Sequence, residues 1–284
     1  KFIFNVQFKI HYIFFYITYF YVLNFINFNN TVNLVFFDIG QGDSCLIRYK
    51  NKTILVDTGP KYYNALAISK KILVPTLRYY GVNTIDYLII THFDSDHDSN
   101  IESLINTFSV KKFIYSGDLN QHDNLPELLS TNSISSHNLC REDKIKLDEL
   151  ELSFLNKCNP PSYLGKNNNS LIFELSYLNH SILFTGDIEK EAEFELINNV
   201  GPNLKSDILK VAHHGSKTSS TDLFLKYTMP AFSIVSCGRL NRYKHPYINV
   251  LDRLKSISTV LQTKISGAIM VDLSKKITIK TFLN

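Results

Sequence analysis

The stretch Thr91-His92-Phe93-Asp94-Ser95-Asp96-His97 sets two histidines and two aspartates within six residues, at the end of the apolar run Ile85–Thr91. Such a short β-branched run is typical of a buried strand. A loop at a strand's end can turn four side chains toward one point, whereas a helix or a strand would separate them. Imidazole and carboxylate groups are ligands of Zn or Mn, so the stretch predicts a metal site. A solvated polar loop is the alternative, but it does not explain why histidines alternate with aspartates.

Two later stretches also place polar residues at the end of an apolar strand. Phe184-Thr185-Gly186-Asp187 combines a glycine, which permits a tight turn, with a charged side chain. Lys210-Val211-Ala212-His213-His214-Gly215-Ser216 contains a histidine pair. A Thr-Gly-Asp sequence is common in turns, and two adjacent histidines can lie on a surface. Each stretch therefore needs a wider pattern before it indicates a site.

Outward from these stretches, strands alternate with helices. The segments 45–49 and 53–57 predict a hairpin that turns at Lys50-Asn51-Lys52. A helix is expected at about 65–80, kinked or broken at Pro75, and the polar segment 116–149 is expected to be an insertion or long loop. Further strands are expected at 31–38, 150–155, 171–178, 182–185, 208–212, 232–236, 260–263, 268–273 and 277–282, and helices at 101–108, 189–198, 220–227 and 248–256. This order predicts the α/β class, with two sheets and outer helices in an αββα sandwich.

The stretch 238–247 gathers cationic and aromatic side chains, namely Arg239, Arg242, Tyr243, Lys244 and Tyr247. The cations could neutralise phosphates, and the two rings could stack on unpaired bases. His245, in the same stretch, could approach a scissile phosphate or donate a proton. A solvated loop is the alternative. The net charge of +4 permits an anionic partner without requiring one.

A glycine-rich stretch, Phe37-Asp38-Ile39-Gly40-Gln41-Gly42-Asp43, precedes all of these. Gly40 and Gly42 let the backbone turn sharply. Asp43 could orient a metal-binding histidine or face solvent. An ordinary β-turn explains the stretch equally well.

Taken together, these stretches resemble the metallo-β-lactamase superfamily. Residues 92–97 are similar to its H-x-[HD]-x-D-H signature, and residues 184–187 to its later F-x-G-D motif. The resemblance implies that His92 and Asp94 hold one metal ion, that Asp96 and His97 hold a second, and that Asp187 bridges the two.

The superfamily places its last metal-binding histidine at the pair 213–214. We favour His213 as the ligand, with His214 as its support or as a substrate contact. Asp98-Ser99-Asn100 departs from the small residues that usually follow the signature, and this departure could alter the turn of the loop.

One branch of the superfamily resembles the chain more specifically: the soluble domain of ComEC-type DNA-uptake competence proteins. Where the superfamily normally supplies another histidine, this chain has Lys166-Asn167-Asn168-Asn169-Ser170-Leu171, and Asn169 is the candidate there. The opening motif with Asp43, the later Val56-Asp57-Thr58-Gly59, the His-His-Gly-Ser sequence and His245-Pro246 are similar to this branch. The resemblance covers roughly residues 32–273, and its first motif combined with His-His-Gly-Ser is specific to the branch.

The resemblance implies a metal-dependent hydrolase, and our hypothesis is a nuclease that cleaves DNA phosphodiesters during competence-related uptake. Two divalent ions, Zn or Mn, would polarise the phosphate and activate water, with Asp96, Asp187 and His245 as catalytic residues. The cations and Tyr243 of the stretch 238–247 would bind single-stranded DNA. The rivals are a hydrolase of the same fold that acts on a lactam, thioester or small ester, and a non-catalytic domain that binds DNA or partner subunits.

Residues 10–37 contain no Lys, Arg, Asp or Glu, and Ile10–Phe28 has about the length that spans a bilayer. No small-residue cleavage site follows, so we expect residues 1–30 to be an uncleaved membrane anchor and residues 31–284 to be the hydrolase domain. Lys1 and Lys9 precede the apolar segment, which puts the domain on the extracytoplasmic side. Subunits of a competence transporter are expected partners there. A buried N-terminal helix and a signal peptide are the alternatives.

The four cysteines contain no C-x-x-C pair, which disfavours a cysteine zinc cage. Cys45 lies in a predicted strand and is expected in the core. Cys140 and Cys158 could form a disulfide in an oxidising compartment.

Overall fold

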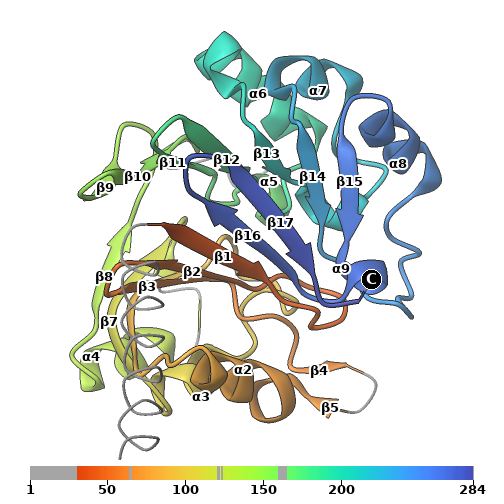
Figure 1. The fold of residues 1–284 in the computed structure, drawn as a ribbon. Helices are drawn as coiled ribbons and strands as arrows, with labels where there is room; N and C mark the ends of the chain where they lie inside the picture. The colour runs from red at the N-terminus through yellow and green to blue at the C-terminus, as the bar shows by residue number, and fades with distance from the viewer. Residues whose placement is uncertain (1–30, 64–65, 120–121, 123, 159–164, 284) are drawn as a thin grey trace, which may run out of the picture.

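Two β-sheets lie face to face with helices on both outer sides, which confirms the predicted αββα sandwich (Figure 1). The computed structural model describes residues 31–63, 66–119, 122, 124–158 and 165–283. The expected anchor, residues 1–30, lies outside this part of the chain. Within the described part, no helix is both long enough and apolar enough to cross a bilayer. The membrane segment of the predicted fold class therefore stays a prediction.

The first sheet has eight strands in the order β17-β16-β1-β2-β3-β6-β7-β8. In chain order they are β1 (Val32–Phe36), β2 (Cys45–Tyr49), β3 (Lys52–Val56), β6 (Thr84–Ile89), β7 (Ser109–Tyr115), β8 (Ser135–Asn138), β16 (Ile269–Leu273) and β17 (Ile277–Thr281). The hairpin β2–β3 turns where the sequence predicts it. The two last strands of the chain pair beside β1, so the N-terminal and C-terminal parts of the fold close one sheet together (Figure 1).

The second sheet has seven strands in the order β15-β14-β13-β12-β11-β10-β9. In chain order they are β9 (Lys144–Leu147), β10 (Leu150–Phe154), β11 (Phe173–Tyr177), β12 (His180–Phe184), β13 (Ile208–Lys210), β14 (Phe232–Val235) and β15 (Thr259–Gln262). β9 to β12 form an antiparallel meander, and β12 to β15 run parallel. The parallel half needs crossover connections, and helices supply them.

Helices cover the outer face of each sheet (Figure 1). The longer ones are α2 (Val74–Tyr79), α3 (Ile101–Ile105) and α4 (Leu125–Thr131) on the first sheet, and α6 (Lys190–Val200), α7 (Asp222–Thr228) and α8 (Ile248–Lys255) on the second. The short elements are β4 (Tyr62–Tyr63), β5 (Leu66–Ala67), α5 (Gly165–Asn168) and α9 (Thr263–Ser266).

The main core lies between the sheets, and its composition follows the strand pattern. In β10 the alternate residues Leu150, Leu152 and Phe154 are buried in this core. β13 is buried along its whole length, because Ile208 faces the core between the sheets and Leu209 faces the core under the outer helices. Parallel strands covered on both faces are expected to be apolar throughout.

The interpretation of residues 116–149 as an insertion or long loop was wrong. The segment contains α4, β8 and β9, and the two strands form edges of the two sheets. β8 has the sequence Ser-Ser-His-Asn and is exposed throughout. It therefore has no alternation of apolar residues that would predict a strand. It is held by backbone pairing with β7, which leaves no pattern in the side chains.

The helix expected at 65–80 begins later and is not broken by its proline. A π-helical turn, Ser69–Leu73, leads into α2, and Pro75 lies in the first turn of α2. Because the π turn continues directly into α2, Pro75 lacks the N–H that would bond back to the preceding turn, and the wider π-helical turn lies where that bond is missing. Residues 62–63 and 66–67 instead form the small hairpin β4–β5.

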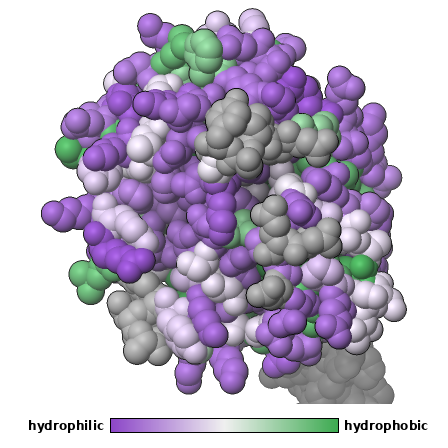
Figure 2. Space-filling view, turned by 180° about the vertical axis from the view of Figure 1, so that it is seen from behind, coloured by the Kyte–Doolittle hydropathy of each residue, from purple (hydrophilic) through white to green (hydrophobic). Residues whose placement is uncertain are grey.

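The surface seen from behind is mostly hydrophilic. Figure 2 shows apolar residues there singly or in small groups among polar side chains, outside the grey atoms. Scattered exposed apolar residues are ordinary on a water-facing surface. This face of the described part therefore offers no broad apolar patch.

Candidate metal centre

Six loops meet at one edge of the sandwich. They follow β1, β3 and β6 in the first sheet and β12, β13 and β14 in the second. Within each sheet these strands point in the same direction. The carboxyl ends of such strands share an edge, which is why motifs distant in sequence come together here.

Four side chains from three of these loops form the centre of the site: Asp96, His97, Asp187 and His214. Each offers one ligand atom, and these atoms lie within 4.8 Å of one another. His214 Nε2 is 3.1 Å from Asp96 Oδ2 and 3.3 Å from Asp187 Oδ2. His97 Nε2 is 3.4 Å from the same Asp187 oxygen. The structure thus brings the three predicted motifs into one group.

A buried carboxylate fixes the orientation of the His97 ring. His97 Nδ1 lies 2.9 Å from Asp57 Oδ2. The Asp57 carboxylate also accepts hydrogen bonds from Thr91 N at 2.7 Å and from Thr91 Oγ1 at 2.8 Å. With Nδ1 held in this way, Nε2 faces Asp187. A metal-binding histidine is commonly oriented by such a carboxylate.

His92 and Asp94 lie beside this group. His92 Nε2 is 3.9 Å from Asp94 Oδ2, and the ring centroids of His92 and His97 are 4.1 Å apart. Burial, reinforced by the charge of His97, lowers the pKa of His92 to about 3. The imidazole is therefore neutral at pH 7, which is the form that binds a metal.

The turn that carries Asp187 packs against the asparagine-rich loop. Gly186 has a φ of 53°, and a Cβ there would lie 2.6 Å from the Ser170 Cβ. Asp187 N donates a hydrogen bond of 3.0 Å to Ser170 Oγ. Asn169, the candidate in this loop, has a buried Oδ1 without a hydrogen-bond partner. It lines a small pocket together with Asn156, and it is absent from the central group of four.

The two adjacent histidines have different surroundings. Both are in the left-handed region, with φ of 49° for His213 and 53° for His214, so the backbone turns sharply between them. His214 is buried, with Nδ1 3.0 Å from the Ser236 carbonyl. His213 is partly exposed, with Nε2 3.9 Å from Asp187 Oδ2 and Nδ1 3.4 Å from Glu189 Oε1. The sequence favoured His213 as the ligand, whereas His214 lies nearer the carboxylates; the ligand assignment stays a prediction.

Asp43 links the first loop to the signature loop. Its backbone N donates a hydrogen bond of 3.1 Å to the Asp96 carbonyl. Its carboxylate lies 2.6 Å from Lys210 Nζ and 3.7 Å from His214 Nδ1. Of the two roles the sequence left open, the structure places Asp43 beside the histidines and not in solvent.

Sequence reasoning missed three residues that support the site: Thr91, Ser170 and Lys210. Thr91 and Ser170 lie inside stretches that the sequence analysis singled out, but they carry no charge that would assign them a role. Lys210 did carry a signal, because it is a lysine at the end of an apolar strand directly before the histidine pair.

The charges of the central group stabilise one another. Burial alone would raise the pKa of the Asp96 and Asp187 carboxyls, but His214 and His97 outweigh it and lower both. Burial alone would lower the pKa of His214, but Asp187 and Asp43 raise it to about 10. Without a metal ion, protons on His97 and His214 thus offset part of the charge of the carboxylates. A divalent cation would replace these protons on binding.

The residues present fit a divalent metal ion. Three atoms that face the site are buried and lack a hydrogen-bond partner: His92 Nε2, His97 Nε2 and Asp187 Oδ1. Buried polar atoms are rarely left unpaired in proteins. Imidazole and carboxylate together are the donor set of Zn and Mn.

The cationic stretch forms a loop at the rim of the site. Arg239 pairs with Asp38 at 2.8 Å, and its side chain is 46% exposed; its contact with a phosphate stays a prediction. The guanidinium of Arg242 lies over the Tyr243 ring at 4.8 Å from its centroid, and Lys244 is exposed. His245 lies between this surface and the histidine pair, and burial, together with the charge of His214, lowers its pKa to about 4.

Comparison with known proteins identifies the class. Residues 37–239 match the family model of the Metallo-beta-lactamase superfamily. The chain therefore belongs to this superfamily, and its fold and donor set are those of a metal-dependent hydrolase.

The predicted resemblance to competence proteins is confirmed. The chain is 33% identical to ComE operon protein 3 of Bacillus subtilis over 248 residues, covering 82% of this chain and 32% of that protein. It is 31% identical to Competence protein ComA of Neisseria gonorrhoeae over 251 residues, covering 87% and 33%. The chain thus spans about a third of the length of these relatives.

A solved structure agrees on the fold. The metallo-beta-lactamase fold protein YhfI from Bacillus subtilis matches 85% of this chain and 100% of its own, with a TM-score of 0.57 and 13% sequence identity.

Proposed function

We propose that this chain is a phosphodiesterase that cleaves single-stranded DNA during DNA uptake. The observation that carries the proposal is a row of rings between the cationic loop and the metal centre. The Tyr243 and His245 rings are stacked with centroids 5.7 Å apart, and the His245 and His214 rings with centroids 6.3 Å apart. Tyr243 is 46% exposed, so a base can reach its ring from solvent once the Arg242 side chain, which lies over the ring, moves aside.

We infer two divalent ions, Zn or Mn, held by His92, Asp94, Asp96, His97, Asp187 and one or both of the adjacent histidines 213 and 214. When bound, the ions would supply Lewis acidity toward the phosphate and lower the pKa of water. Asp96 and Asp187 remain carboxylates at neutral pH because their pKa values are lowered. Their oxygens can accept the hydrogens of the attacking water and orient it.

His245 fits a hydrogen-bonding contact to the phosphate better than proton donation. Its lowered pKa leaves the imidazole neutral at pH 7. Its Nδ1 is buried and has no hydrogen-bond partner. Bound cations would disfavour the protonated ring further, because like charges repel.

The cations and the exposed ring suit a single strand of nucleic acid. Arg242 and Lys244 can neutralise successive phosphates, while a base stacks on Tyr243 without regard to its identity. A duplex would keep its bases inside and could not use the ring. One of the relatives is named a competence protein, which supports DNA as the polymer.

A cleavage assay tests the proposal. The domain from residue 31 onward is incubated with single-stranded DNA and Mn or Zn, beside the double variant His92→Ala, Asp96→Ala. The matched control is His137→Ala, Asp148→Ala, which removes the same residue types at exposed positions. We expect cleavage by the wild type and the control, and none by the site variant. Equal cleavage by the wild type, the site variant and the control would contradict the assignment of the site.

The rival functions predict different outcomes when the same proteins are also tested on small substrates and for DNA binding. A hydrolase for small substrates would cleave nitrocefin or a thioester and leave the DNA intact. A non-catalytic module would bind DNA even after the metal is chelated. Either result would contradict the nuclease proposal while leaving the fold and the superfamily unchanged.

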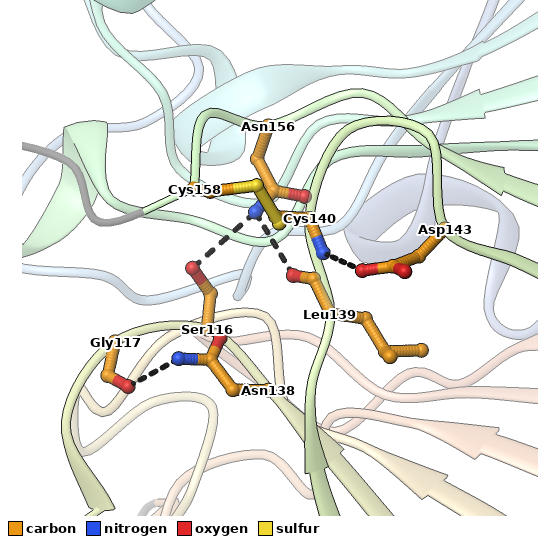
Figure 3. The surroundings of a disulfide bond; sticks show 8 residues. All are labelled: Ser116, Gly117, Asn138, Leu139, Cys140, Asp143, Asn156 and Cys158. Atoms are coloured by element: carbon orange, nitrogen blue, oxygen red, sulfur yellow. Dashed lines mark hydrogen bonds between the residues drawn. A yellow bond between two sulfur atoms is a disulfide. The ribbon is translucent and has the colours of Figure 1, made fainter.

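We also propose that the domain lies on the extracytoplasmic side of a membrane, anchored by residues 1–30. Cys140 and Cys158 form a disulfide beside Asn156 (Figure 3), and disulfides persist in oxidising compartments. β1 starts beside the Lys50-Asn51 turn, at the edge opposite the metal loops. An anchor that ends just before β1 would therefore leave the metal centre facing away from the bilayer.

Labelling in cells tests the location. An Asn51→Cys variant of the full chain is treated with a thiol reagent that cannot cross membranes. We expect labelling in intact cells. Labelling only after the cells are permeabilised would place the domain in the cytoplasm.

A further inference from the structure

Lys210 is the only buried lysine or arginine among the described residues, with 4% of its surface exposed. It ends β13. Its Nζ lies 2.6 Å from Asp43 Oδ2 and donates a hydrogen bond of 3.1 Å to the Val211 carbonyl. Burying an ammonium group is unfavourable unless it is paired, so its presence here needs a reason beyond packing.

Three buried carboxylates stabilise this ammonium. Burial alone would lower the pKa of Lys210, but the charges of Asp43, Asp187 and Asp57 together raise it. These aspartates are 5%, 2% and 1% exposed, respectively. Close carboxylates without a cation among them would repel one another strongly in such a medium.

Through Asp43 the ammonium reaches the candidate ligands. The backbone N of Asp43 donates a hydrogen bond to the Asp96 carbonyl. The Asp43 carboxylate lies 3.7 Å from His214 Nδ1 and 4.0 Å from His97 Nδ1. Asp43, Asp57 and His97 also form a group with the geometry to hold a cation. Lys210 already supplies a positive charge at that place.

We propose that Lys210 is a positioning residue that acts as a permanent internal cation. It balances the carboxylates and keeps the centre assembled before any metal ion arrives. The inference rests on the metal centre and not on the DNA substrate. It can therefore fail while the proposed nuclease activity holds, and it can hold while the proposed nuclease activity fails.

The test compares thermal unfolding of the whole chain with chelator and with Mn²⁺. Lys210→Met is expected to lower the melting temperature of the metal-free protein by on the order of 10 °C, because it leaves Asp43 buried without its hydrogen-bonded cation. Mn²⁺ should raise the melting temperature more in the variant than in the wild type, because the ions replace the missing charge. Lys112→Met is the control, since that lysine is exposed on β7, and it should change neither value.

The double variant Lys210→Met, Asp43→Asn separates charge from packing. Removing the unpaired carboxylate should restore most of the metal-free melting temperature. Equal losses with chelator and with Mn²⁺ in the single variant would overturn the proposal, because a packing defect does not depend on the metal. If the single variant does not fold, the double variant decides: a folded double variant supports the proposal, and an unfolded one overturns it.

Discussion

His97 uses its two ring nitrogens for different partners. Nδ1 is held by Asp57, and Nε2 faces Asp187 in the centre. The same carboxylate holds the backbone and hydroxyl of Thr91, so one buried aspartate fixes both ends of the signature loop. At the scale of a residue, the site depends on groups outside the set of candidate metal ligands.

Asp57→Asn is therefore expected to weaken metal binding by roughly 10- to 100-fold, the usual effect of losing such a supporting carboxylate. Titration calorimetry with Mn²⁺ measures the affinity. Asp86→Asn is the matched control, because Asp86 is also buried but pairs with Lys111 on the first sheet. An unchanged affinity in Asp57→Asn would show that His97 is oriented by something else.

At the scale of the elements, the loops at the active edge are packed directly on one another. Gly42 has a φ of 144°, and a Cβ at this position would overlap the Asp96 carbonyl oxygen and lie 2.8 Å from Pro60 Cδ. The first loop can approach the signature loop only because this residue has no side chain. A glycine of these motifs can therefore permit close contact between two loops as well as a sharp turn of the backbone.

Gly42→Ala is expected to destabilise the protein by about 2 kcal/mol or more and to weaken Mn²⁺ binding, because the signature loop must move. Gly117→Ala is the control, since its φ is 99° but nothing lies within 4 Å of an added Cβ. Denaturant unfolding and calorimetry give the two quantities. Equal losses in both variants would mean that backbone conformation, and not the contact, is responsible.

Asp86 joins three neighbouring strands of the first sheet. It lies on β6 and accepts hydrogen bonds from Thr53 N on β3 at 3.0 Å and from Lys111 Nζ on β7 at 2.8 Å. Burial alone would raise the pKa of Asp86, but Lys111, Thr53 N and Lys52 outweigh it and lower it. The pair therefore stabilises the fold only while the carboxyl is ionised.

A carboxyl whose pKa is lower in the folded state stabilises the fold above its unfolded pKa of about 3.9, and this stabilisation is lost as the pH falls further. Asp86→Asn should thus cost about 1–2 kcal/mol at pH 7. The difference between wild type and variant should stay constant down to about pH 4 and shrink below it. Urea unfolding at a series of pH values measures it; a difference that does not depend on pH would contradict the ionic origin.

At the scale of the whole molecule, the metal loops and the turn beside the start of β1 lie at opposite edges. The cations of the loop 238–247 are at the metal edge, and Lys275 and Lys276 lie in the β16–β17 turn at the other edge. A net charge of +4 does not by itself direct a polyanion to one edge. Only cations near the site should contribute to productive binding.

Arg242→Gln with Lys244→Gln is expected to weaken single-stranded DNA binding and to reduce the slope of log affinity against log salt by about 1.4, from roughly 0.7 per phosphate contact. Lys275→Gln with Lys276→Gln removes the same charge at the far edge and should leave the slope nearly unchanged. Fluorescence anisotropy over a salt series measures both. Equal slopes for the two variants would contradict the assignment of the loop.

The sequence by itself determined the class of fold, the hairpin β2–β3 and the residues that the three metal motifs contain. These depend on local patterns, such as alternation within a strand or ligand types within a loop. They could be read without knowing what lies nearby.

Only the tertiary structure decided which segments meet. It paired β16 and β17 with β1, made the polar segment 135–138 an edge strand, and joined Cys140 to Cys158. It also turned His214 inward and buried Lys210 beside Asp43. These outcomes arise from contacts between residues far apart in the chain, where backbone pairing and buried charge leave no periodic trace in the sequence.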